Sequence, residues 1–568
     1  MDMHCKLLLY LDVRRHLNSM KNCCEEFVEN LDEKTIHKFP PLRFLLEIDV
    51  MDVLDFMPSL GNFLIREPLK LQYMCNDIFY ACFQSLDSET VENVKPAQLA
   101  VTLRLKSLPI HLSYSENSSS LRNFSGLLIS LTKPTSYVYH TVWSCPEECE
   151  ENEVILQHIP KLPPKCYICK SVLYENSGFR RCGEKVKATF KIKNIFLCRT
   201  FNIIDDLIPL LSLGKSYAFT AVVIKTSYLV WALEEANILL APVTSPIPSD
   251  IKELYHACDG LPWKFIYCLS SSIGVRSSPL NCFMHVKINL LLSLTSVKAN
   301  ILTGSQILHF LAAGYDTGYV GSIMEQAARL ADRHILLGNS ISSASTSLIA
   351  SSGGVCVMPL PLHVYKQKTT YDILSSLETG VISTTNTKLK CAVWAQGMDF
   401  KKIILYNVAS IFGYVSRGDY GDYSDELGDF ILEQAIESGK QSREEIQALE
   451  DVALYMDLVS GLEVSLGKEA ELLLRNYFLA ARKERPKAVT VGSMNALVLI
   501  CMTSARLCRR TVTNIEDAVF AIWLHVSGIP EPRFAPVEYL ETPSDITKLQ
   551  VIMNNFKVWL ENFIGSLL

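Results

Sequence analysis

Apolar residues recur at three- and four-residue spacing from Phe39 to about Leu86, a period that predicts helices. Pro58 and Pro68 stand where new helices would begin, because proline suits the first turn of a helix. The pattern predicts an N-terminal helical subdomain over residues 1–98.

The pattern changes to short β segments between about Val101 and Ala241. The segments AVTLRLKSLPI, SGLLISLTK, KVKATFKIK and KSYAFTAVVIK alternate or are rich in β-branched and aromatic residues, and turn-forming residues separate them. Strands of this kind predict a small barrel of the oligonucleotide-binding (OB) type over residues 99–241.

A linker rich in proline and serine is predicted at residues 242–252, and the pattern changes again beyond it. Helical segments alternate there with the short apolar runs KANILTG, HILLGN, GGVCVMP and LKCAVWAQG. Such alternation is typical of an α/β layer with a largely parallel sheet, which we expect over residues 253–430. An acidic stretch at 417–429 is expected to be an exposed crossing segment.

The last part of the chain is predicted to be helical. Helices are expected at 468–483, 490–508 and 513–526, the last of them started by the capping box TNIE. They define a helical domain at 431–530, and a tail with a terminal helix follows at 531–568. The fold class predicted from these patterns is multidomain α/β.

Composition narrows the class of protein. A chain of 568 residues is too long for one core, and three or four folding units are expected at ~150 residues each. The longest apolar runs, such as Ile288–Leu292 and Leu497–Cys501, are far shorter than the ~18 residues that cross a bilayer. With no signal-peptide cleavage pattern, the 18 cysteines predict reduced thiols in a soluble intracellular protein. The net charge of −6 means that any contact with nucleic acid would need a local basic patch.

Cysteine spacing is the strongest local signal. Cys145 and Cys149 form one close pair, and Cys166 and Cys169 form a second pair about sixteen residues further on. Two such pairs predict a tetrahedral Zn²⁺ site in an insertion at about 143–184, because each pair can bridge two corners of the tetrahedron. Four free thiols are the alternative, and Cys182 and His158 are possible replacement ligands.

A row of lysines follows the cysteines in RRCGEKVKATFKIKN. If this segment is a strand, one face carries the lysines and the other carries apolar residues that face the core; the lysines are Lys185, Lys187, Lys191 and Lys193. The row could track a phosphate backbone by charge, or it could be an ordinary solvated strand face.

A search for phosphate-binding loops finds only imperfect matches. LGKS at 213–216 has Pro209 where the first glycine should stand, and it leads into a β segment instead of a helix. ILTGSQILHFL at 301–311, the first expected strand-to-helix turn of the α/β layer, has one glycine and no lysine. Without the lysine and glycines that a triphosphate needs, the chain is not expected to bind ATP in the usual way. No Ser-His-Asp, Cys-His or paired-carboxylate arrangement is evident either.

The order of parts resembles that of the minichromosome maintenance (MCM) proteins, the ring helicase subunits of chromosome replication. The resemblance covers roughly residues 40–530. LEIDVMDVLDFMPSLGNFLIREPLKL is similar to the N-terminal helical segment of that family, CPEEC with CYIC to its zinc-binding insertion, and the region from LEVSLGKEAELLLRNYF to NIEDAVFAIWL to its C-terminal lid. The resemblance implies an OB-fold with a zinc-binding insertion, a degenerate AAA+ domain at 253–430 and a helical lid at 431–530.

Four positions depart from what active members carry. Pro359 and Leu360 stand where the family has its Mg²⁺-binding Asp and catalytic Glu, Ile411 stands at the arginine finger, and Gly492 stands at the second sensor arginine. ANILTGSQILHF takes the place of the Walker A loop without its Gly-Lys-Ser. Because an arginine finger alone is worth ~10³ or more in rate, the loss of all these elements predicts a chain with no catalytic residues and no ATP chemistry.

A further departure concerns DNA. LETGVISTTNTKLKCAVWAQG is similar to the pre-sensor hairpin of the family, and Asn386 stands where a DNA-gripping lysine is usual. Lys388 or Lys390 could substitute for it. Residues 304–352 match the family least, and no role is assigned to them.

The resemblance implies a non-catalytic protein that acts as a DNA-associated scaffold or partner in meiotic recombination and double-strand break repair. Zinc is the implied cofactor, and DNA, single-stranded or in recombination intermediates, is the implied ligand. Other MCM paralogues and meiotic recombination proteins are the implied partners, the nucleus is the implied location, and no membrane is involved.

Two alternatives remain open. The chain could be a subunit of an ATP-dependent DNA helicase ring that uses sites from neighbouring subunits, although Ile411 at the finger position argues against it. It could also be a zinc-stabilised interaction module without DNA contact. The lysine row favours the DNA-associated scaffold over this module.

Overall fold

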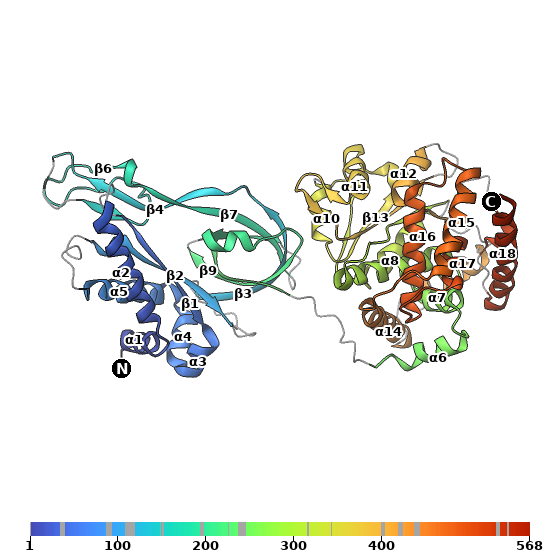
Figure 1. Ribbon diagram of the computed structural model, residues 1–568, viewed down its shortest axis with the longest axis horizontal. Coiled ribbons are helices and arrows are strands. Elements are labelled where there is room, and N and C mark those ends of the chain that lie inside the picture. The colour runs from blue at the N-terminus through green and yellow to red at the C-terminus, as the bar shows by residue number, and fades with distance from the viewer. Residues whose placement is uncertain are drawn as a thin grey trace. The chain divides into compact units, whose positions relative to one another are not determined.

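The computed structural model describes most of the chain. The residues outside the description are 1, 35–39, 87–93, 108–119, 148, 150–152, 193–197, 225, 237–245, 315–316, 342, 399–403, 418–423, 437–442, 530–533, 542–544 and 568. The chain divides into two compact units, Met1–Asn237 and Ile238–Leu568, and each is described by itself (Figure 1). Among the described helices, none is both long and apolar enough to span a membrane.

The N-terminal unit begins with helices packed on a small parallel sheet. The helices are α1 (Met3–Val13), α2 (His16–Lys34), α3 (Val50–Phe56), α4 (Pro58–Arg66) and α5 (Pro68–Gln84). As predicted, Pro58 and Pro68 occupy the first turns of α4 and α5.

The helical prediction is wrong for one stretch of this unit. β1 (Leu42–Asp49) is a strand that pairs in parallel with β2 (Leu99–Lys106). The apolar residues of LRFLLEID also fit a strand, and tertiary pairing with β2 decides between the two periods. The boundary predicted between residues 98 and 99 therefore divides two hydrogen-bonded strands.

Five strands close a barrel next to this sheet. They are β3 (Leu121–Leu131), β7 (Arg181–Ile192), β8 (Cys198–Ile204), β9 (Ser216–Ile224) and β10 (Ser227–Glu235). β3 pairs with both β7 and β9, β7 pairs with β8, and β10 pairs with β9 in antiparallel fashion and with β8 in parallel, so the ring of pairings closes. Aromatic side chains such as Phe190, Phe201 and Phe219 fill its interior.

Two consecutive acids join the barrel to the parallel sheet. Arg43 of β1 donates to Asp205 at 2.8 Å, and Arg104 of β2 binds both carboxylate oxygens of Asp206. Both acids follow β8 directly in a short 3₁₀ turn, and Arg104 is buried. These paired charges fix the helical part against the barrel in one register.

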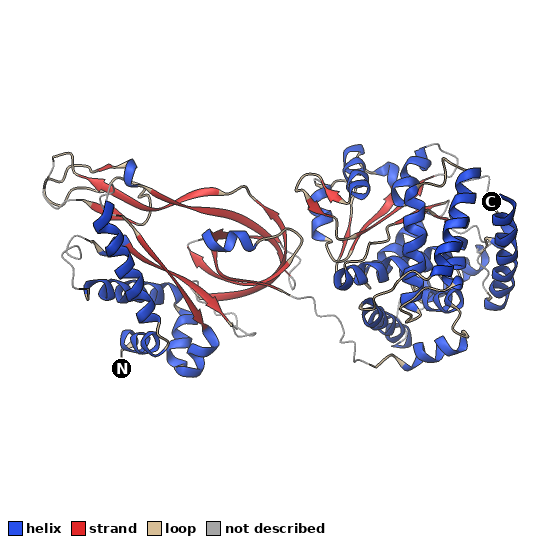
Figure 2. Cartoon of the chain, in the orientation of Figure 1, coloured by secondary structure: helices blue, strands red, loops and turns tan. Residues whose placement is uncertain are grey.

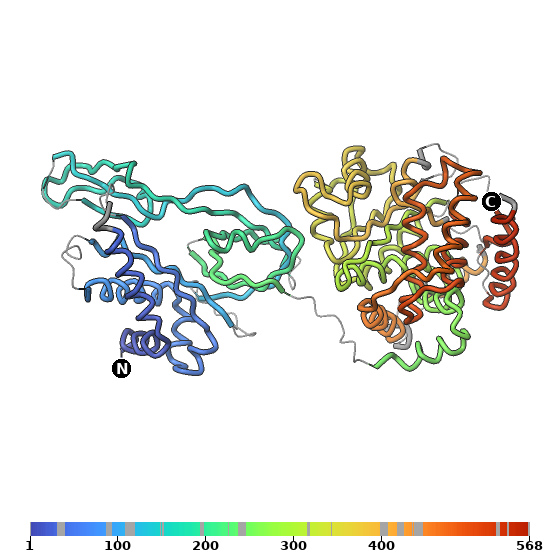
Figure 3. Tube along the Cα trace, in the orientation of Figure 1, coloured from blue at the N-terminus to red at the C-terminus, as the bar shows by residue number. Residues whose placement is uncertain are grey.

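Three further strands carry an insertion that leaves the barrel between β3 and β7. They are β4 (Thr135–Ser144), β5 (Val154–Leu156) and β6 (Tyr174–Glu175), and β4 pairs with β7 on one side and with β5 and β6 at its far end. Figure 3 shows the trace running out along β4 and returning along β7.

The C-terminal unit contains a parallel sheet of five strands in the order β12-β13-β16-β11-β17. The strands are β11 (Phe310–Ala313), β12 (His334–Leu336), β13 (Val355–Pro361), β16 (Ala392–Met398) and β17 (Ser416–Arg417). Helices lie on both faces of this sheet (Figure 2). The predicted strands HILLGN, GGVCVMP and LKCAVWAQG are confirmed as β12, β13 and β16.

The fourth predicted strand is wrong. KANILTG forms the end of α8 (Met284–Thr303), and the first strand of the sheet is β11, which follows it. The lysine, asparagine and alanine of this segment fit a helix, and Gly304 ends α8 in the left-handed conformation typical of a helix C-terminus. Within the run LHFLAAG only the four residues Phe310–Ala313 form the strand, and four residues are too short a signal to separate a strand from a helix.

Helices and one hairpin complete this unit. The helices are α6 (Ser249–Ala257), α7 (Pro262–Ser271), α9 (Thr317–Ala328), α10 (Ala344–Ala350), α11 (Gln367–Thr379), α12 (Ile404–Phe412), α13 (Ser424–Ile436), α14 (Arg443–Ser460), α15 (Lys468–Glu484), α16 (Val491–Leu507), α17 (Ile515–Gly528) and α18 (Ile546–Leu567), and the hairpin is β14 (Val381–Ile382) with β15 (Thr387–Lys388). The predicted linker at 242–252 lies partly outside the described residues, and its last four residues belong to α6. The capping box of α17 lies one residue later than predicted, with Asn514 and Asp517 as its members.

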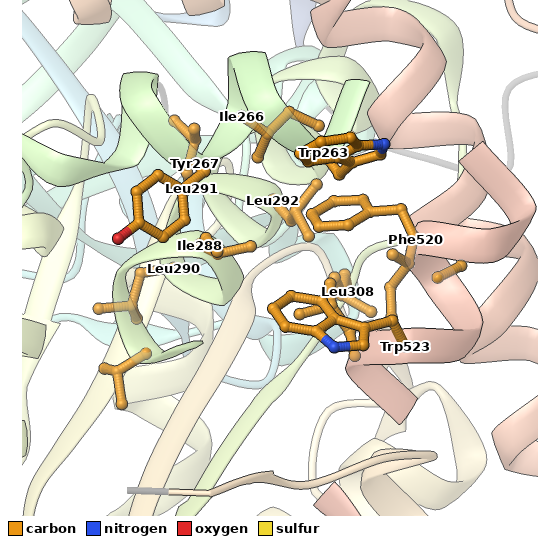
Figure 4. Close-up of a cluster of buried hydrophobic side chains, with 14 of the residues drawn as sticks. Trp263, Ile266, Tyr267, Ile288, Leu290, Leu291, Leu292, Leu308, Phe520 and Trp523 are labelled. Carbon is orange, nitrogen blue, oxygen red and sulfur yellow. The ribbon is translucent and has the colours of Figure 1, made fainter. Parts of the chain in front are cut away.

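The helices after residue 431 share one core with the α/β layer. Figure 4 shows Trp263 and Ile266 of α7, Leu291 and Leu292 of α8 and Phe520 and Trp523 of α17 in one cluster. The predicted helical lid is therefore packed as part of a single compact unit.

Candidate metal centre and nucleotide-site positions

The four predicted cysteines lie together at the far end of the insertion. One ligand atom from each of Cys145, Cys149, Cys166 and Cys169 lies within 4.8 Å of all the others, and the Sγ atoms of Cys145 and Cys169 are 3.4 Å apart. Four thiolates at ~2.3 Å from a Zn²⁺ ion stand about 3.8 Å from one another. The group could therefore hold a metal ion such as zinc.

The chain builds this centre from a strand end and a tight turn. Cys145 follows β4, and the segment from Cys166 to Lys170 turns back on itself: the Lys170 N–H donates to the Cys166 carbonyl and the Cys166 N–H donates to the Ser171 carbonyl at 2.8 Å. Lys170 adopts a φ of 63°, which closes the turn. The Cys169 N–H donates to the Cys166 sulfur at 3.4 Å, so the backbone of the turn holds this sulfur in place.

The thiols of Cys169 and Cys149 differ in pKa. Hydrogen bonds from Ser171 lower the pKa of Cys169 to about 6. Burial, with the neighbouring thiols, raises the pKa of Cys149 to about 12. A divalent cation would favour the thiolate form of all four, because metal ligation and thiol deprotonation are linked. Trp143 and Leu173 cover the group from the side of the insertion core.

The two suggested replacement ligands are not in this group. Cys182 lies on β7 and is exposed, and His158 follows β5 and is exposed. Neither joins the cluster among the described residues, so the set of ligand candidates is the predicted one.

The lysine row lies on β7 with the alternation that the sequence predicts. Val186, Ala188, Phe190 and Ile192 are buried in the barrel, whereas Lys185, Lys187 and Lys191 occupy the other face. Lys185 and Lys187 form no ion pair within the described part of the chain. Lys193 lies outside the described residues.

Pro359 and Leu360 lie near the carboxyl end of β13, whose last residue is Pro361. Val355–Met358 are buried, but Leu360 is 38% exposed. The Leu360 N–H donates to the Tyr365 hydroxyl at 3.2 Å, and that hydroxyl donates to the Leu337 carbonyl. Residues 359–361 read Pro-Leu-Pro, so the end of this strand offers no carboxylate ligand for Mg²⁺.

Helix α9 approaches this strand end closely. A Cβ atom at Gly321 would lie 2.6 Å from the Pro359 carbonyl oxygen and 2.8 Å from Nε2 of Gln396. Gln396 itself donates from Nε2 to the Pro359 carbonyl, and its Oε1 has no hydrogen-bond partner among the described residues. The sequence analysis did not single out Gly321 or Gln396, because neither stands at a position where the family carries a catalytic group.

The first strand-to-helix turn of the sheet lies between β11 and α9, not at residues 301–311 as predicted. Part of that turn, residues 315–316, lies outside the described residues. The printed sequence of β11, the turn and α9 is FLAAGYDTGYVGSIMEQAA, which contains no lysine or arginine. The unassigned segment 304–352 therefore contains the strand, the turn and the helix where a phosphate loop would be expected.

Ile411 and Gly492 lie on two helices that touch. Ile411 is half-buried on α12, and Gly492 belongs to the first turn of α16. A Cβ atom at Gly492 would lie 2.6 Å from the Ser410 carbonyl oxygen, closer than real Cβ contacts. Position 492 therefore serves as a contact between backbones and has no room for an arginine.

The predicted hairpin forms from β14 and β15. Asn386 lies in its turn with a φ of 52°, and it is exposed, as are Lys388 and Lys390. An asparagine in this conformation is a turn residue, and the two lysines supply the nearby positive charge.

Comparison with known proteins reaches across both units. The family model described as "MCMDC2, N-terminal domain" matches residues 3–108, which include β1 and β2 of the N-terminal unit. The rat and mouse proteins named minichromosome maintenance domain-containing protein 2 are each 22% identical to this chain over 91% of it and 89% of their own length. The human protein of that name is 21% identical over 92% of this chain and 90% of its own. The resemblance predicted from the sequence is thus confirmed, and the chain is similar to proteins named minichromosome maintenance domain-containing protein 2 along nearly its whole length.

Proposed function

We propose that this protein is a non-catalytic MCM-like protein that acts on DNA as a scaffold or partner in meiotic recombination and double-strand break repair. The observation that carries the proposal is the packing at the positions where the family handles phosphate. Gly492 meets the Ser410 carbonyl, and Gly321 meets the Pro359 carbonyl, each at 2.6 Å from an added Cβ. At position 492 a backbone contact takes the place of the arginine that the resemblance implies, and the end of β13 carries no carboxylate, so both positions lack the charged groups that would serve hydrolysis.

The topology of each unit supports an MCM-type architecture. Numbered along the chain, the five barrel strands pair in the cyclic order 1-2-3-5-4, the order of an OB-fold. The five strands of the parallel sheet stand in the order 5-1-4-3-2, which AAA+ domains share. This arrangement supports a degenerate AAA+ domain whose sheet is retained as a core.

The lysine face supports a contact with DNA. β7 and β8 are the second and third strands of the barrel, and OB-folds bind oligonucleotides on the face of these two strands. Lys185, Lys187 and Lys191 lie on the outer face of β7, and Asn202 and Thr200 of β8 pair beside Lys187 and Thr189. Cationic and polar groups in two adjacent rows suit a single-stranded phosphate backbone.

Zinc is the metal that we assign to the cysteine group. Four thiolates in two close pairs form a closed donor set, which is typical of structural zinc and leaves no position for a reacting water. The ion would hold the turn at Cys166–Lys170 against the end of β4. Its part is to stabilise the insertion and not to take part in a reaction.

Partners and location follow from the same resemblance. Relatives carry the MCM name, so other MCM paralogues, meiotic recombination proteins and DNA in recombination intermediates are the partners that we propose, with the nucleus as the location. A pull-down from meiotic tissue tests partner and process together. Recovery of recombination proteins is expected, and recovery of replication helicase subunits with ATPase activity would favour the ring-helicase alternative.

The direct test of the DNA assignment is a charge-reversal series with Lys185→Glu, Lys187→Glu and Lys191→Glu. Fluorescence anisotropy with a single-stranded oligonucleotide should show a large loss of affinity, and the salt slope should fall by ~0.7 for each phosphate contact removed. The matched control reverses three exposed lysines of the other unit, Lys366, Lys368 and Lys468. Equal losses in both sets would leave only non-specific attraction, and unchanged binding in the β7 set would favour a zinc-stabilised module without DNA contact.

A further inference from the structure

A tight turn joins the first two helices of the C-terminal unit. α6 leads into α7 (Figure 1), and Cys258 ends α6. The Leu261 N–H donates to the Cys258 carbonyl, and Asp259 and Gly260 adopt left-handed backbone with φ of 55° and 68°. Two left-handed residues in succession reverse the chain sharply, so α7 returns alongside α6.

Side chains face one another across this turn. The Tyr255 and Phe265 rings meet edge to face with their centroids 5.2 Å apart. The Nζ atom of Lys264 lies 3.4 Å from a carboxylate oxygen of Asp259. These contacts hold the facing sides of α6 and α7 together on both sides of the turn.

Two thiols meet between the same helices. Cys258 and Cys268 have the same separation along the chain as the two rings, and a hydrogen bond joins their thiols. Cys258 is 2% exposed, whereas Cys268 is half-buried. The hydrogen bond, helped by the Lys264 ammonium and opposed by burial, lowers the pKa of Cys268, and the same bond raises the pKa of Cys258. The Cys258 thiol is therefore the donor, and the Cys268 sulfur is the one that carries a thiolate.

A second pair of nearby thiols lacks this combination. Cys356 and Cys391 are both 0% exposed, and burial raises the pKa of Cys356 well above its ordinary value and that of Cys391 to about 12. A reactive cysteine needs thiolate character and access to the reagent. Cys268 has both, and it also has a second thiol in contact.

We propose that Cys258 and Cys268 form a disulfide when hydrogen peroxide oxidises the chain, and that this bond fastens α6 to α7. The Cys268 thiolate attacks one peroxide oxygen; an S–O bond forms, the O–O bond breaks, and the released hydroxide takes up a proton to become water. The Cys258 sulfur then attacks the sulfur of the Cys268 sulfenic acid. The S–O bond breaks, and the hydroxyl group leaves with the Cys258 proton as a second water. The two sulfurs lose two electrons in all, and the peroxide takes them up.

The bond would constrain a weakly held helix. α6 has no side-chain cap hydrogen bond at its N-terminus within the described part of the chain, and Ile251 is its buried residue. A disulfide that closes the loop 258–268 opposes local opening of α6, because it restricts the opened state. This inference does not depend on the proposed role in recombination or on DNA binding.

The test treats the zinc-loaded full chain with ~0.1 mM hydrogen peroxide at neutral pH and then alkylates the remaining thiols. Trypsin cuts after Lys264, so the two cysteines fall on separate peptides, 253–264 and 265–276. Mass spectrometry should find these two peptides joined, and dithiothreitol should separate them again. Hydrogen exchange over residues 249–257 should slow by ~10-fold in the linked chain.

Single-cysteine variants check the order of the steps. In Cys258→Ser the Cys268 sulfenic acid has no thiol to meet and should accumulate, as labelling with dimedone measures. In Cys268→Ser the Cys258 thiol should stay free. Cys182, an exposed thiol on β7, is the internal reference in every digest and should be oxidised more slowly than Cys268.

Oxidation of Cys182 in wild-type chains whose Cys258 and Cys268 are still free would overturn the proposed pair. Sulfenic acid at Cys258 in the Cys268→Ser variant, formed as fast as the disulfide of the wild type, would contradict the order of steps. Unchanged exchange of α6 in the linked chain would overturn the fastening of this helix.

Discussion

The four cysteines and the four nucleotide-site positions differ in whether the structure brings their side chains together as possible ligands. Cys145, Cys149, Cys166 and Cys169 meet within 4.8 Å, and a backbone N–H donates to the Cys166 sulfur. We propose that Pro359, Leu360, Ile411 and Gly492 stand where active family members carry catalytic groups; a Cβ atom at Gly492 would meet the Ser410 carbonyl oxygen, whereas Leu360 is 38% exposed. On this proposal, the first set has kept its ligand side chains, whereas the second contributes only to the fold.

The two sets also differ in whether their surroundings serve a second purpose, the packing of a hydrophobic core. The strand end at Pro359 still belongs to the buried sheet, because Val355–Met358 fill the core whatever follows them. The metal ligands have no such second role: the core around them holds few residues, of which Trp143 and Leu173 are the buried apolar ones besides the cysteines. We infer that the insertion depends on its metal more than the α/β layer depends on a nucleotide.

The largest expected effect therefore comes from removing the metal ligands. Cys166→Ser should abolish binding of one zinc ion per chain and unfold the insertion, because structural zinc contributes on the order of ~10 kcal/mol to small sites. Elemental analysis and hydrogen exchange over residues 143–184 measure the two effects. Cys182→Ser, which changes an exposed thiol outside the group, is the control and should leave zinc content unchanged. A wild-type chain without zinc under reducing conditions would contradict the assignment.

A smaller loss of stability should follow when an arginine is placed at position 492. Gly492→Arg forces a Cβ to 2.6 Å from the Ser410 carbonyl oxygen, and overpacking of this kind costs about 2–3 kcal/mol. Val491→Arg, one residue earlier at a position that is 62% exposed, should change stability little. Urea unfolding of both variants measures the difference, and equal stabilities would show that position 492 is not constrained by packing.

Acid should weaken the C-terminal helices α15 and α17 by one route and the cysteine group by another. Burial lowers the pKa of His525 to about 4, so between pH 6.5 and 4 the unfolded chain binds a proton that the folded chain does not. Lowering the pH from 6.5 to 5.5 should then cost about 1 kcal/mol of unfolding free energy at this residue. Native-state hydrogen exchange of α15 and α17, where Tyr477 contacts His525 at 2.8 Å, measures it.

The matched variant for this acid effect is His525→Gln, which keeps a polar partner for Tyr477 but does not titrate. Its stability should change less between the two pH values. Release of zinc from the cysteine group, measured separately with a metal indicator, reports the other route, since ligand thiols regain their protons. An acid loss in α15 and α17 that is identical in the glutamine variant would contradict the role of His525.

The smallest effect is expected from restoring the acids alone. The double change Pro359→Asp and Leu360→Glu alters positions at the exposed end of β13, so stability should shift by no more than ~0.5 kcal/mol. No ATPase activity should appear, because no lysine stands between β11 and α9 and no arginine fits at Gly492. Measurable hydrolysis would show that the lost acids alone kept the site silent.

The sequence predicts local features of this molecule well where a pattern is short-range. The cysteine pairs are close in the chain, so their spacing suffices to bring them together. The alternation of β7 is equally local, and Val186, Ala188, Phe190 and Ile192 face the core as expected.

Features that depend on distant partners were harder to predict. β1 has apolar residues that suit a helix, and only its pairing with β2, more than fifty residues away, makes it a strand. β11 is four residues long, and the preceding helix α8 is buried on all sides from Met284 to Ala299, so no one-sided periodicity marks where the helix ends and the strand begins. The contacts of Gly321 with Pro359 and of Gly492 with Ser410 also lie between separate elements, and no spacing in the sequence indicates them.

Titration of the zinc-loaded full chain with Mg-ATP in a calorimeter tests the central claim most directly. The account predicts no heat of binding up to ~1 mM nucleotide, a concentration at which even a millimolar site would be half filled. Stoichiometric binding with a micromolar dissociation constant would contradict it, because it would show that the packed strand end and helix still form a nucleotide site.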